Sequence, residues 1–378
     1  MEARAFWRIF TWVVVGLGIA LCGVLTLGEW ALMAAAYGPA VALVALLIAG
    51  VPAVFFLVAV LALDLYEPEP PALLLLVLLW GAGVATLTGG LASALAGGLT
   101  QAVLAAFAPD RAATVAQIAS VCLFAPLFEE AAKAVVLLGL FFFKRDEFNG
   151  IIDGIIYGAL AGLGFAITEN VGYHGGFVQE GGWAGGLAQA AFRQALLAFM
   201  HPLWTSITGL GLGWARQSRS WAVRILAPPL GFAGAVGLHG AWNSTAVVTG
   251  MVGNQTLFLL MPALYTFVIL LVLGVAAYNL HREATLLKRH LWPEVEAGRL
   301  TPEEHRLLCS FWARLRASMS ALGRRGLAGW WACVEFSHTA TELAILRQRV
   351  HIGELSSAQG AELEKEHLAR LAALRGRF

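Results

Sequence analysis

Apolar residues occur along this chain in long uninterrupted runs. Eight of the runs are long enough to cross a bilayer, whose hydrocarbon core needs about 20 apolar helical residues. The runs are Ile9–Leu27, Pro39–Leu63, Ala72–Ala96, Thr114–Phe143, Ile151–Glu169, Ala191–Trp214, Val223–Thr249 and Thr256–Leu280. The pattern predicts an all-α, polytopic membrane bundle of about eight transmembrane helices, with the membrane domain covering residues 1–280.

Charged residues are concentrated after position 280, so residues 281–378 are expected to form a helical cytoplasmic tail. Leu363, Leu368 and Leu371 recur at helical spacing and predict an amphipathic helix near the end. The run Thr301–Glu304 resembles a helix start with Pro at the first position. The tail holds no catalytic pattern and is expected to serve packing, oligomerisation or partner binding.

Composition supports a membrane protein and excludes some partners. Hydrophobic residues make up 59% of the 378 residues and charged residues 13%, against about 25% charged in soluble domains. A net charge of +1 argues against a nucleic-acid partner. The four cysteines are scattered, with neither metal-ligand spacing nor a disulfide framework.

The placement of Lys and Arg predicts the orientation in the membrane. Basic residues lie before the first run, after the fourth, between the sixth and seventh, and after the eighth. Before the tail they are Arg4, Arg8, Lys144, Arg145, Arg216, Arg219 and Arg224. With eight spans all four sites fall on one side, which the positive-inside rule makes the cytoplasm. Both termini and the proline-rich loop Asp64–Pro71 are therefore expected to be cytoplasmic.

Two adjacent carboxylates, Glu129 and Glu130, lie inside the fourth run together with Lys133. Each ionised side chain costs roughly 2.5–3.5 kcal/mol in the middle of a membrane helix and is usually retained for a function. A structural ion pair between Glu129 and Lys133, four residues apart, is one alternative. That pair leaves the second carboxylate without a partner.

Three further runs carry polar residues. Glu169 and Asn170 close the fifth run, His201 lies in the sixth, and His239 and Asn243 share one face of the seventh. Taken alone, each is typical of a hydrogen bond between membrane helices. Their common depth in the membrane, however, indicates that they belong to one site.

The depth of these groups follows from the basic residues nearest in sequence. Glu130, His201 and His239 each lie about 15 residues from Lys144, Arg216 or Arg224, which is roughly 21–23 Å of helix. Glu169 falls within about two turns of the same level. Four helices thus carry ionisable groups to one layer in the outer half of the membrane, which favours a functional site.

Such a layer can activate water. A buried Glu can act as general base toward a water molecule, and His or Asn donors can stabilise the oxyanion formed at a peptide carbonyl. Pro126 removes a backbone hydrogen bond just before the Glu pair, and the local opening would help to admit water. Lys133 could keep one Glu ionised while the other works.

The fifth run also has structural features. It carries a small residue at every fourth position, at Gly150, Gly154, Gly158 and Gly162. This stripe predicts close approach of a neighbouring helix. Asp153 is interpreted as a structural residue at the helix N-terminus. The Gly-rich segment His174–Gly186 is expected to form a mobile loop on the outer face.

These residues resemble the PrsW intramembrane proteases, within the wider CAAX-protease and bacteriocin-processing superfamily. The run Glu129–Lys133 resembles the Glu-Glu motif, Phe165 through Glu169 and Asn170 the second motif, and His201 and His239 with Asn243 the His motifs. The runs Tyr66–Pro70 and Asp153–Gly158 also resemble PrsW. The likeness spans about residues 60–250 and leaves the tail without a counterpart.

The resemblance implies cleavage of a single-span membrane protein near the outer face, typically an anti-sigma factor in a bacterial stress response, in the bacterial inner membrane. It implies that Glu129 is the general base, that Glu130 supports it, and that His and Asn residues position the water. Because Glu169 replaces the usual His of the second motif, His201 is the alternative oxyanion donor. Lys133, Asn170, Phe165 and Asp153 are expected to be supporting residues.

Two alternatives remain open at this point. Glu129, Glu130, Glu169, His201 and His239 could bind zinc, whose catalytic sites take three His or carboxylate ligands and a water, although no His-Glu-x-x-His helix is present. No cofactor is favoured, and zinc is the alternative. Intramembrane carboxylates and histidines also build the proton relays of transporters, but the chain shows no repeat of either pattern.

Overall fold

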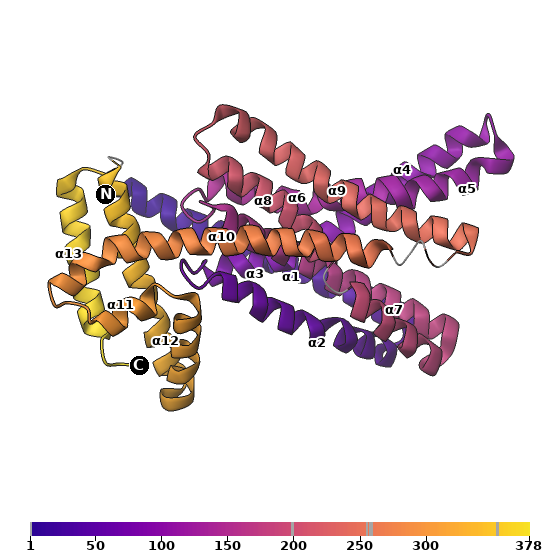
Figure 1. The fold of residues 1–378 in the computed structure, drawn as a ribbon. Coiled ribbons are helices and arrows are strands. Elements are labelled where there is room, and N and C mark those ends of the chain that lie inside the picture. Colours follow the sequence, from indigo (N-terminus) through magenta and orange to yellow (C-terminus); the bar gives the residue numbers. More distant parts are fainter. Residues whose placement is uncertain (1, 198–199, 255, 257–259, 353–354) are drawn as a thin grey trace. The chain divides into compact units, whose positions relative to one another are not determined.

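The computed structural model describes residues 2–197, 200–254, 256, 260–352 and 355–378. Helices joined by short connections account for nearly all of this part of the chain, which contains no strand (Figure 1). They are α1 (Glu2–Tyr37), α2 (Pro39–Leu63), α3 (Pro71–Leu79), η1 (Trp80–Ala85), α4 (Thr86–Ala105), α5 (Pro109–Ala119), η2 (Ser120–Phe124), α6 (Ala125–Phe143), α7 (Ile151–Leu197), α8 (Met200–Gln217), α9 (Trp221–Val252), α10 (Leu260–Glu296), α11 (Pro302–Leu308), α12 (Phe311–His351) and α13 (Ser357–Leu374). The elements η1 and η2 are π-helical.

The chain divides into two compact units. The first contains the chain up to Val60 and the segment Glu69–Leu273, and the second contains Leu61–Pro68 and Gly274–Phe378. Helix α10 contributes to both units. The second unit thus joins a short loop between two membrane helices to the C-terminal part of the chain.

Several apolar helices identify the protein as a multi-pass membrane protein. Within the described residues, six segments are long and apolar enough to cross a bilayer. They are Ile9–Tyr37, Pro39–Leu63, Pro71–Ala105, Ile151–Gln194, Trp221–Val252 and Leu260–Glu296. The other two predicted runs correspond to α5, η2 and α6, and to α8, which carry Glu, Lys, His or Arg side chains. Residues 198–199 of the sixth run and 257–259 of the eighth lie outside the described residues.

The predicted loop at His174–Gly186 is wrong, because α7 runs through it. The helical path is interrupted within α7 at Gly182, where φ is +65° and ψ is −176°. Glycine adopts such a conformation without steric cost. His174 then meets Gln194, 3.2 Å away between Nε2 and Oε1, so the second part of α7 returns beside the first. The several glycines lower helix propensity by only about 1 kcal/mol each, which packing offsets.

The glycine stripe of α7 packs directly on the backbone of α8, as the sequence predicts. A Cβ atom at Gly154, Gly158 or Gly162 would lie 2.1–2.5 Å from the carbonyl oxygens of Gly209, Thr205 and His201 respectively. Such distances are far inside van der Waals contact, so only glycine permits this separation of the helices. The stripe thereby sets the distance between Glu169 on α7 and His201 on α8.

We expect Gly154→Ala to force α7 and α8 apart. Overpacking of a core typically costs about 1–3 kcal/mol, and here the obstructing atoms are backbone rather than a movable side chain. The thermal unfolding midpoint in detergent should fall, together with proteolytic activity. Gly139→Ala on α6 is the matched control, because a Cβ there meets nothing within 4 Å. Equal behaviour of the two variants would contradict the role of the stripe.

The second unit has its own hydrophobic core. Side chains from α10, α12 and α13 form it, including Leu291, Phe336, Leu343 and Leu371. The predicted helix start at Thr301 is confirmed, because Thr301 and Glu304 form a capping box at the start of α11. The predicted C-terminal amphipathic helix corresponds to α13, which buries Leu371 and Leu374.

Arg314 holds the loop Leu61–Pro68 in the second unit. Its guanidinium is fully buried, donates to the carbonyl oxygens of Leu308 and Leu65, and lies 4.6 Å from the ring centroid of Tyr66. Burial lowers the pKa of Arg314 to about 10, and the nearby Tyr66 opposes that change. Residues 64–70, between α2 and α3, are non-helical, as the prolines of the predicted loop Asp64–Pro71 indicate.

Candidate active site

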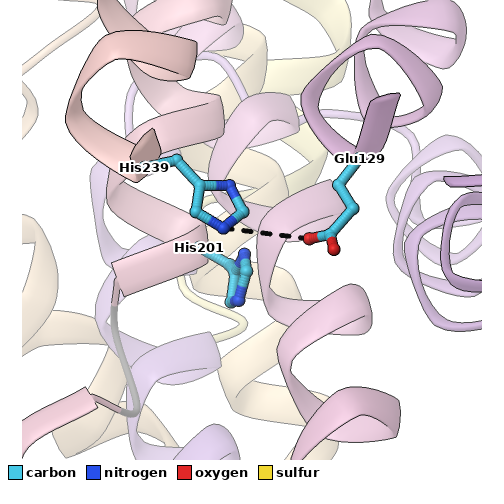
Figure 2. Close-up of side chains that lie close together, drawn as sticks. All are labelled: Glu129, His201 and His239. Carbon is cyan, nitrogen blue, oxygen red and sulfur yellow. Dashed lines mark ion pairs between the residues drawn. The ribbon is translucent and has the colours of Figure 1, made fainter. Parts of the chain in front are cut away.

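Polar side chains from separate helices of the first unit meet in one group. Figure 2 shows the ring of His239, from α9, pointing toward the carboxylate of Glu129 on α6, with the ring of His201, from α8, beside them. Donor atoms of the three side chains all lie within 4.8 Å of one another. His239 Nε2 and Glu129 Oε2 are 3.9 Å apart. Residues expected to share a depth thus lie side by side.

Glu130 is held on every side. It is fully buried, and its Oε1 accepts from Lys133 Nζ at 2.7 Å and lies 3.2 Å from His239 Nδ1. Its Oε2 accepts from Thr205 Oγ1 at 2.9 Å. Both oxygens are therefore engaged by protein groups. Glu130 is placed to orient its neighbours rather than to contact a substrate.

Lys133 pairs with Glu130 and not with Glu129, so the ion pair considered from the sequence involves the other carboxylate. Positions three and four apart are both neighbours on a helix, and Thr205 and His239 draw the Glu130 side chain to this side. Lys133 Nζ also lies 2.9 Å from His201 Nδ1 and 3.6 Å from the ring centroid of Phe165. Phe165 thus contributes a cation–π contact to the group.

These contacts assign the ring protons of both histidines. An ammonium group only donates, so His201 Nδ1 accepts from Lys133 and the His201 proton lies on Nε2, 2.9 Å from Glu169 Oε2. An ionised carboxylate only accepts, so the His239 proton lies on Nδ1 and points to Glu130. His239 Nε2 therefore keeps a lone pair directed toward Glu129.

Glu169 is bound by two donors. Besides His201, its Oε2 accepts from an Nη atom of Arg193 at 3.1 Å. Arg193 Nε donates to Asn170 Oδ1 at 2.8 Å, and the guanidinium lies 3.7 Å from the ring centroid of Tyr173. Arg193 thus fixes the Glu169–Asn170 pair from the returning part of α7.

A cavity of about 590 Å³ opens onto this group. Glu129 and Glu169 line it, together with the aromatic side chains of Phe165 and Tyr173, whereas Glu130 does not. Glu129 Oε2 is buried and has no hydrogen-bond partner in the described part of the chain. Of the two adjacent carboxylates, Glu129 is therefore the one that faces the space a substrate could occupy.

A family model described as the PrsW family intramembrane metalloprotease matches residues 69–274. The chain belongs to this family. The PrsW match contains every candidate catalytic residue named from the sequence, and it ends at residue 274, where the C-terminal segment of the second unit begins. The protein is therefore a member of a family of membrane-embedded proteases. Searches of curated proteins and of solved structures find no match.

Asn243 of this PrsW protein lies one turn beyond His239 but contacts a backbone group. Its Nδ2 donates to the carbonyl oxygen of Val121 at 2.9 Å, in the π-helix η2. In a π-helix that oxygen would accept from the residue five positions on, which is Pro126 and has no N–H. The carbonyl that the proline leaves free is thus satisfied by Asn243, which ties α9 to the start of α6.

Asp153, predicted to support the site, lies in the first turn of α7. Its Oδ2 accepts from the backbone N–H groups of Asn149 and Gly150, both at 2.7 Å. Sixteen residues separate Asp153 from Glu169, about 24 Å along a helix, so Asp153 does not belong to the group of polar side chains. It caps the helix that carries Glu169, which agrees with the structural interpretation.

The family description raises the question of a metal. Glu129, His201 and His239 are the right residue types at the right spacing for a zinc ion. Glu129 Oε2 and His239 Nε2 are free to coordinate, whereas the lone pair of His201 is taken by Lys133. Glu130 and Glu169 are likewise engaged by other groups. The residue types fit a zinc ion, but the hydrogen bonds do not, because His201 would have to give up its contact with Lys133 to coordinate the ion.

Sequence reasoning missed three groups near the site: Arg193, Thr205 and Glu29. Arg193 was visible as a cation inside the predicted run Ala191–Trp214. Glu29 lies just beyond the predicted end of the first run at Leu27, but α1 continues to Tyr37 and Glu29 lines the cavity. Thr205 carries no sequence signal apart from its place one turn after His201.

Proposed function

We propose that this PrsW-family protein hydrolyses a peptide bond of a single-span membrane protein, using a water activated by Glu129. The observation that carries this proposal is the position of Glu129, which lines the cavity. Its buried Oε2 has no hydrogen-bond partner among the described residues and lies 3.9 Å from His239 Nε2. Two hydrogen-bond acceptors at this separation leave room for one water that donates to both. The carboxylate then receives a proton when the water oxygen attacks.

The chain's own residues supply the remaining steps. The water oxygen bonds to the peptide carbonyl carbon while its proton passes to Glu129. The oxyanion is stabilised by a donor such as His201 Nε2–H, which now faces Glu169. The C–N bond breaks as Glu129 returns the proton to the leaving nitrogen. Glu130, through its contact with His239 Nδ1, holds the imidazole in the orientation that directs Nε2 at the water.

The same proposal includes the topology expected from the sequence. Helices α6 and α8 would complete eight spans with the six apolar ones, placing both termini in the cytoplasm of a bacterium and the site in the outer half of the inner membrane. An anti-sigma factor is the type of substrate that this placement suits. The second unit would serve assembly or partner binding.

The test compares cells that express the wild type with cells that express Glu129→Gln. New protein termini are mapped in the membrane fraction of both. A single-span protein cut near its outer boundary only with the wild type would support the proposal and identify the substrate. If both proteins are inserted and no terminus differs, the proposal is wrong, and uptake assays would examine the transporter alternative.

Zinc-dependent hydrolysis is a second candidate, favoured by the spacing of Glu129, His201 and His239. These residues would hold the ion, which as a Lewis acid lowers the pKa of bound water. The engagement of His201 by Lys133 favours direct activation by Glu129 instead.

We therefore expect the purified protein to keep cleaving a model substrate after treatment with a zinc chelator. The physical reason is that Glu129 alone supplies the base and no step needs a bound ion. Metal content measured by mass spectrometry accompanies the assay. Loss of activity with chelation and recovery with added Zn²⁺, but not Mg²⁺, would establish the second candidate.

A further inference from the structure

Glu29 stands out among the carboxylates that line the cavity. Helix α1 carries it within the apolar segment Ile9–Tyr37, and it faces the same cavity as Glu129. An ionised carboxylate inside a membrane span is unfavourable in free energy unless it forms an ion pair or faces a polar cavity. Glu29 lies outside the matched region 69–274 and takes no part in the chemistry proposed above.

The position of Glu29 is fixed by its neighbours on α1. Trp30 Nε1 donates to Thr168 Oγ1 on α7 at 3.0 Å. Thr26 lies against η1, where a Cβ on Gly83 would approach its Oγ1 to 2.7 Å. Contacts on both sides of Glu29 therefore hold α1 against the helices that form the site, and the carboxylate is presented to the cavity by a packed helix.

Glu29 accepts a hydrogen bond from Thr86, but it shares this donor with other acceptors. Both of its oxygens lie near Thr86 Oγ1, at 3.1 and 2.8 Å. The same hydroxyl lies 3.0 Å from the carbonyl oxygens of Ala82 and Gly83. A threonine hydroxyl has one proton, so it serves only one of these acceptors at a time. Glu29 thus retains most of its acceptor capacity.

The two cationic side chains near the site already form ion pairs with other carboxylates. Lys133 pairs with Glu130, and Arg193 pairs with Glu169. Among the described side chains, the cavity lining contains Glu29, Glu129, Glu169 and Glu180 and no Lys or Arg. The group of donors close enough to share a metal ion consists of Glu129, His201 and His239, so such an ion would leave Glu29 unpaired.

We propose that Glu29 binds a lysine or arginine side chain of the substrate, next to the peptide bond that Glu129 hydrolyses. This inference rests on the proposed function. A substrate segment that places its carbonyl at Glu129 fills the same cavity that Glu29 lines, so a neighbouring side chain lies within reach of it. The ammonium or guanidinium group of the substrate would donate a charge-assisted hydrogen bond to the Glu29 carboxylate and form an ion pair with it. Tyr37 and Phe177 provide further lining for the alkyl part of the side chain.

The probe is a set of tagged single-span model proteins with one Leu/Ala span. Each member carries Lys, Gln or Glu at one position of the outer third of the span. The full-length protease in liposomes is expected to cleave the best Lys member about ten-fold faster than its Gln counterpart, as a charge-assisted hydrogen bond predicts. Glu29→Gln should remove this ratio while leaving cleavage of the Gln member in place. Glu29→Lys should favour the Glu member.

Three outcomes overturn the inference: the wild type cleaves Lys and Gln members alike, Glu29→Gln slows both members equally, or Glu180→Gln removes the Lys preference in place of Glu29→Gln. Thr86→Val removes the hydroxyl but keeps the carboxylate, and it should keep the Lys-to-Gln ratio. If it abolishes that ratio, Glu29 acts through helix packing. Thermal unfolding of Glu29→Gln verifies that the variant is folded.

Failure of the proposed function is distinguishable in the same assay. Glu129→Gln should cleave no member of the set, whatever its charge. If the wild type also cleaves none, or if Glu129→Gln equals the wild type, the protease mechanism fails. If the wild type cleaves and Glu129→Gln does not, while charge has no effect, only the role of Glu29 is wrong.

Discussion

Replacing Glu129 with Gln is expected to lower peptide cleavage by about 10²–10⁴-fold, the range that a positioned general base contributes. Gln has nearly the same shape, and Glu129 Oε2 makes no hydrogen bond within the described chain that the substitution could break. The fold should therefore survive while the acceptor for the water proton is lost. Cleavage of a model substrate by purified protein, with thermal unfolding in parallel, measures both effects.

The matched control for Glu129→Gln is Glu303→Gln, which makes the same chemical change on the surface of the second unit. Glu303 pairs there with Arg306, and both side chains are more than two-thirds exposed. An exposed pair of this kind contributes little, so activity and stability should match the wild type. If Glu129→Gln keeps the activity of the control, another group activates the water and the assignment of the base is wrong.

The sequence predicts the convergence of Glu129, His201 and His239 because charge inside an apolar helix is informative. Placing such groups at one depth needs only the positions of the basic residues and the helix rise. The glycine stripe of α7 was readable for a similar reason, since small residues at fixed spacing permit one kind of packing. These features are local patterns with a single physical interpretation.

Other features depend on the tertiary structure, which the pattern does not specify. Lys133 can reach Glu129 or Glu130 on a helix, and the choice depends on Thr205 and His239 from other helices. Asn243 shares a helix face with His239, yet it satisfies a carbonyl that becomes free only because η2 is π-helical. The glycines after His174 suggested a loop, although packing keeps the segment helical up to Gly182.

Replacing Lys133 with Met is expected to destabilise the first unit by about 3–5 kcal/mol, the usual cost of removing one partner of a buried ion pair. Lys133 and Glu130 are both fully buried, so the variant leaves a carboxylate without its cation inside the membrane domain. It also frees His201 Nδ1, which allows the imidazole proton to move away from Glu169. Both stability and cleavage should fall.

The double variant Glu130→Gln with Lys133→Met separates these two effects. Removing both charges while conserving volume is often nearly neutral for a buried pair, so most of the lost stability should return. Cleavage should remain low, because His239 Nδ1 then lacks its charged acceptor and His201 Nδ1 lacks its ammonium donor. Unfolding in detergent and cleavage of one model substrate are measured for all variants. A single Lys133→Met variant as stable as the wild type would show that the pair is dispensable, and a fully active double variant would show that the histidines need no such orientation.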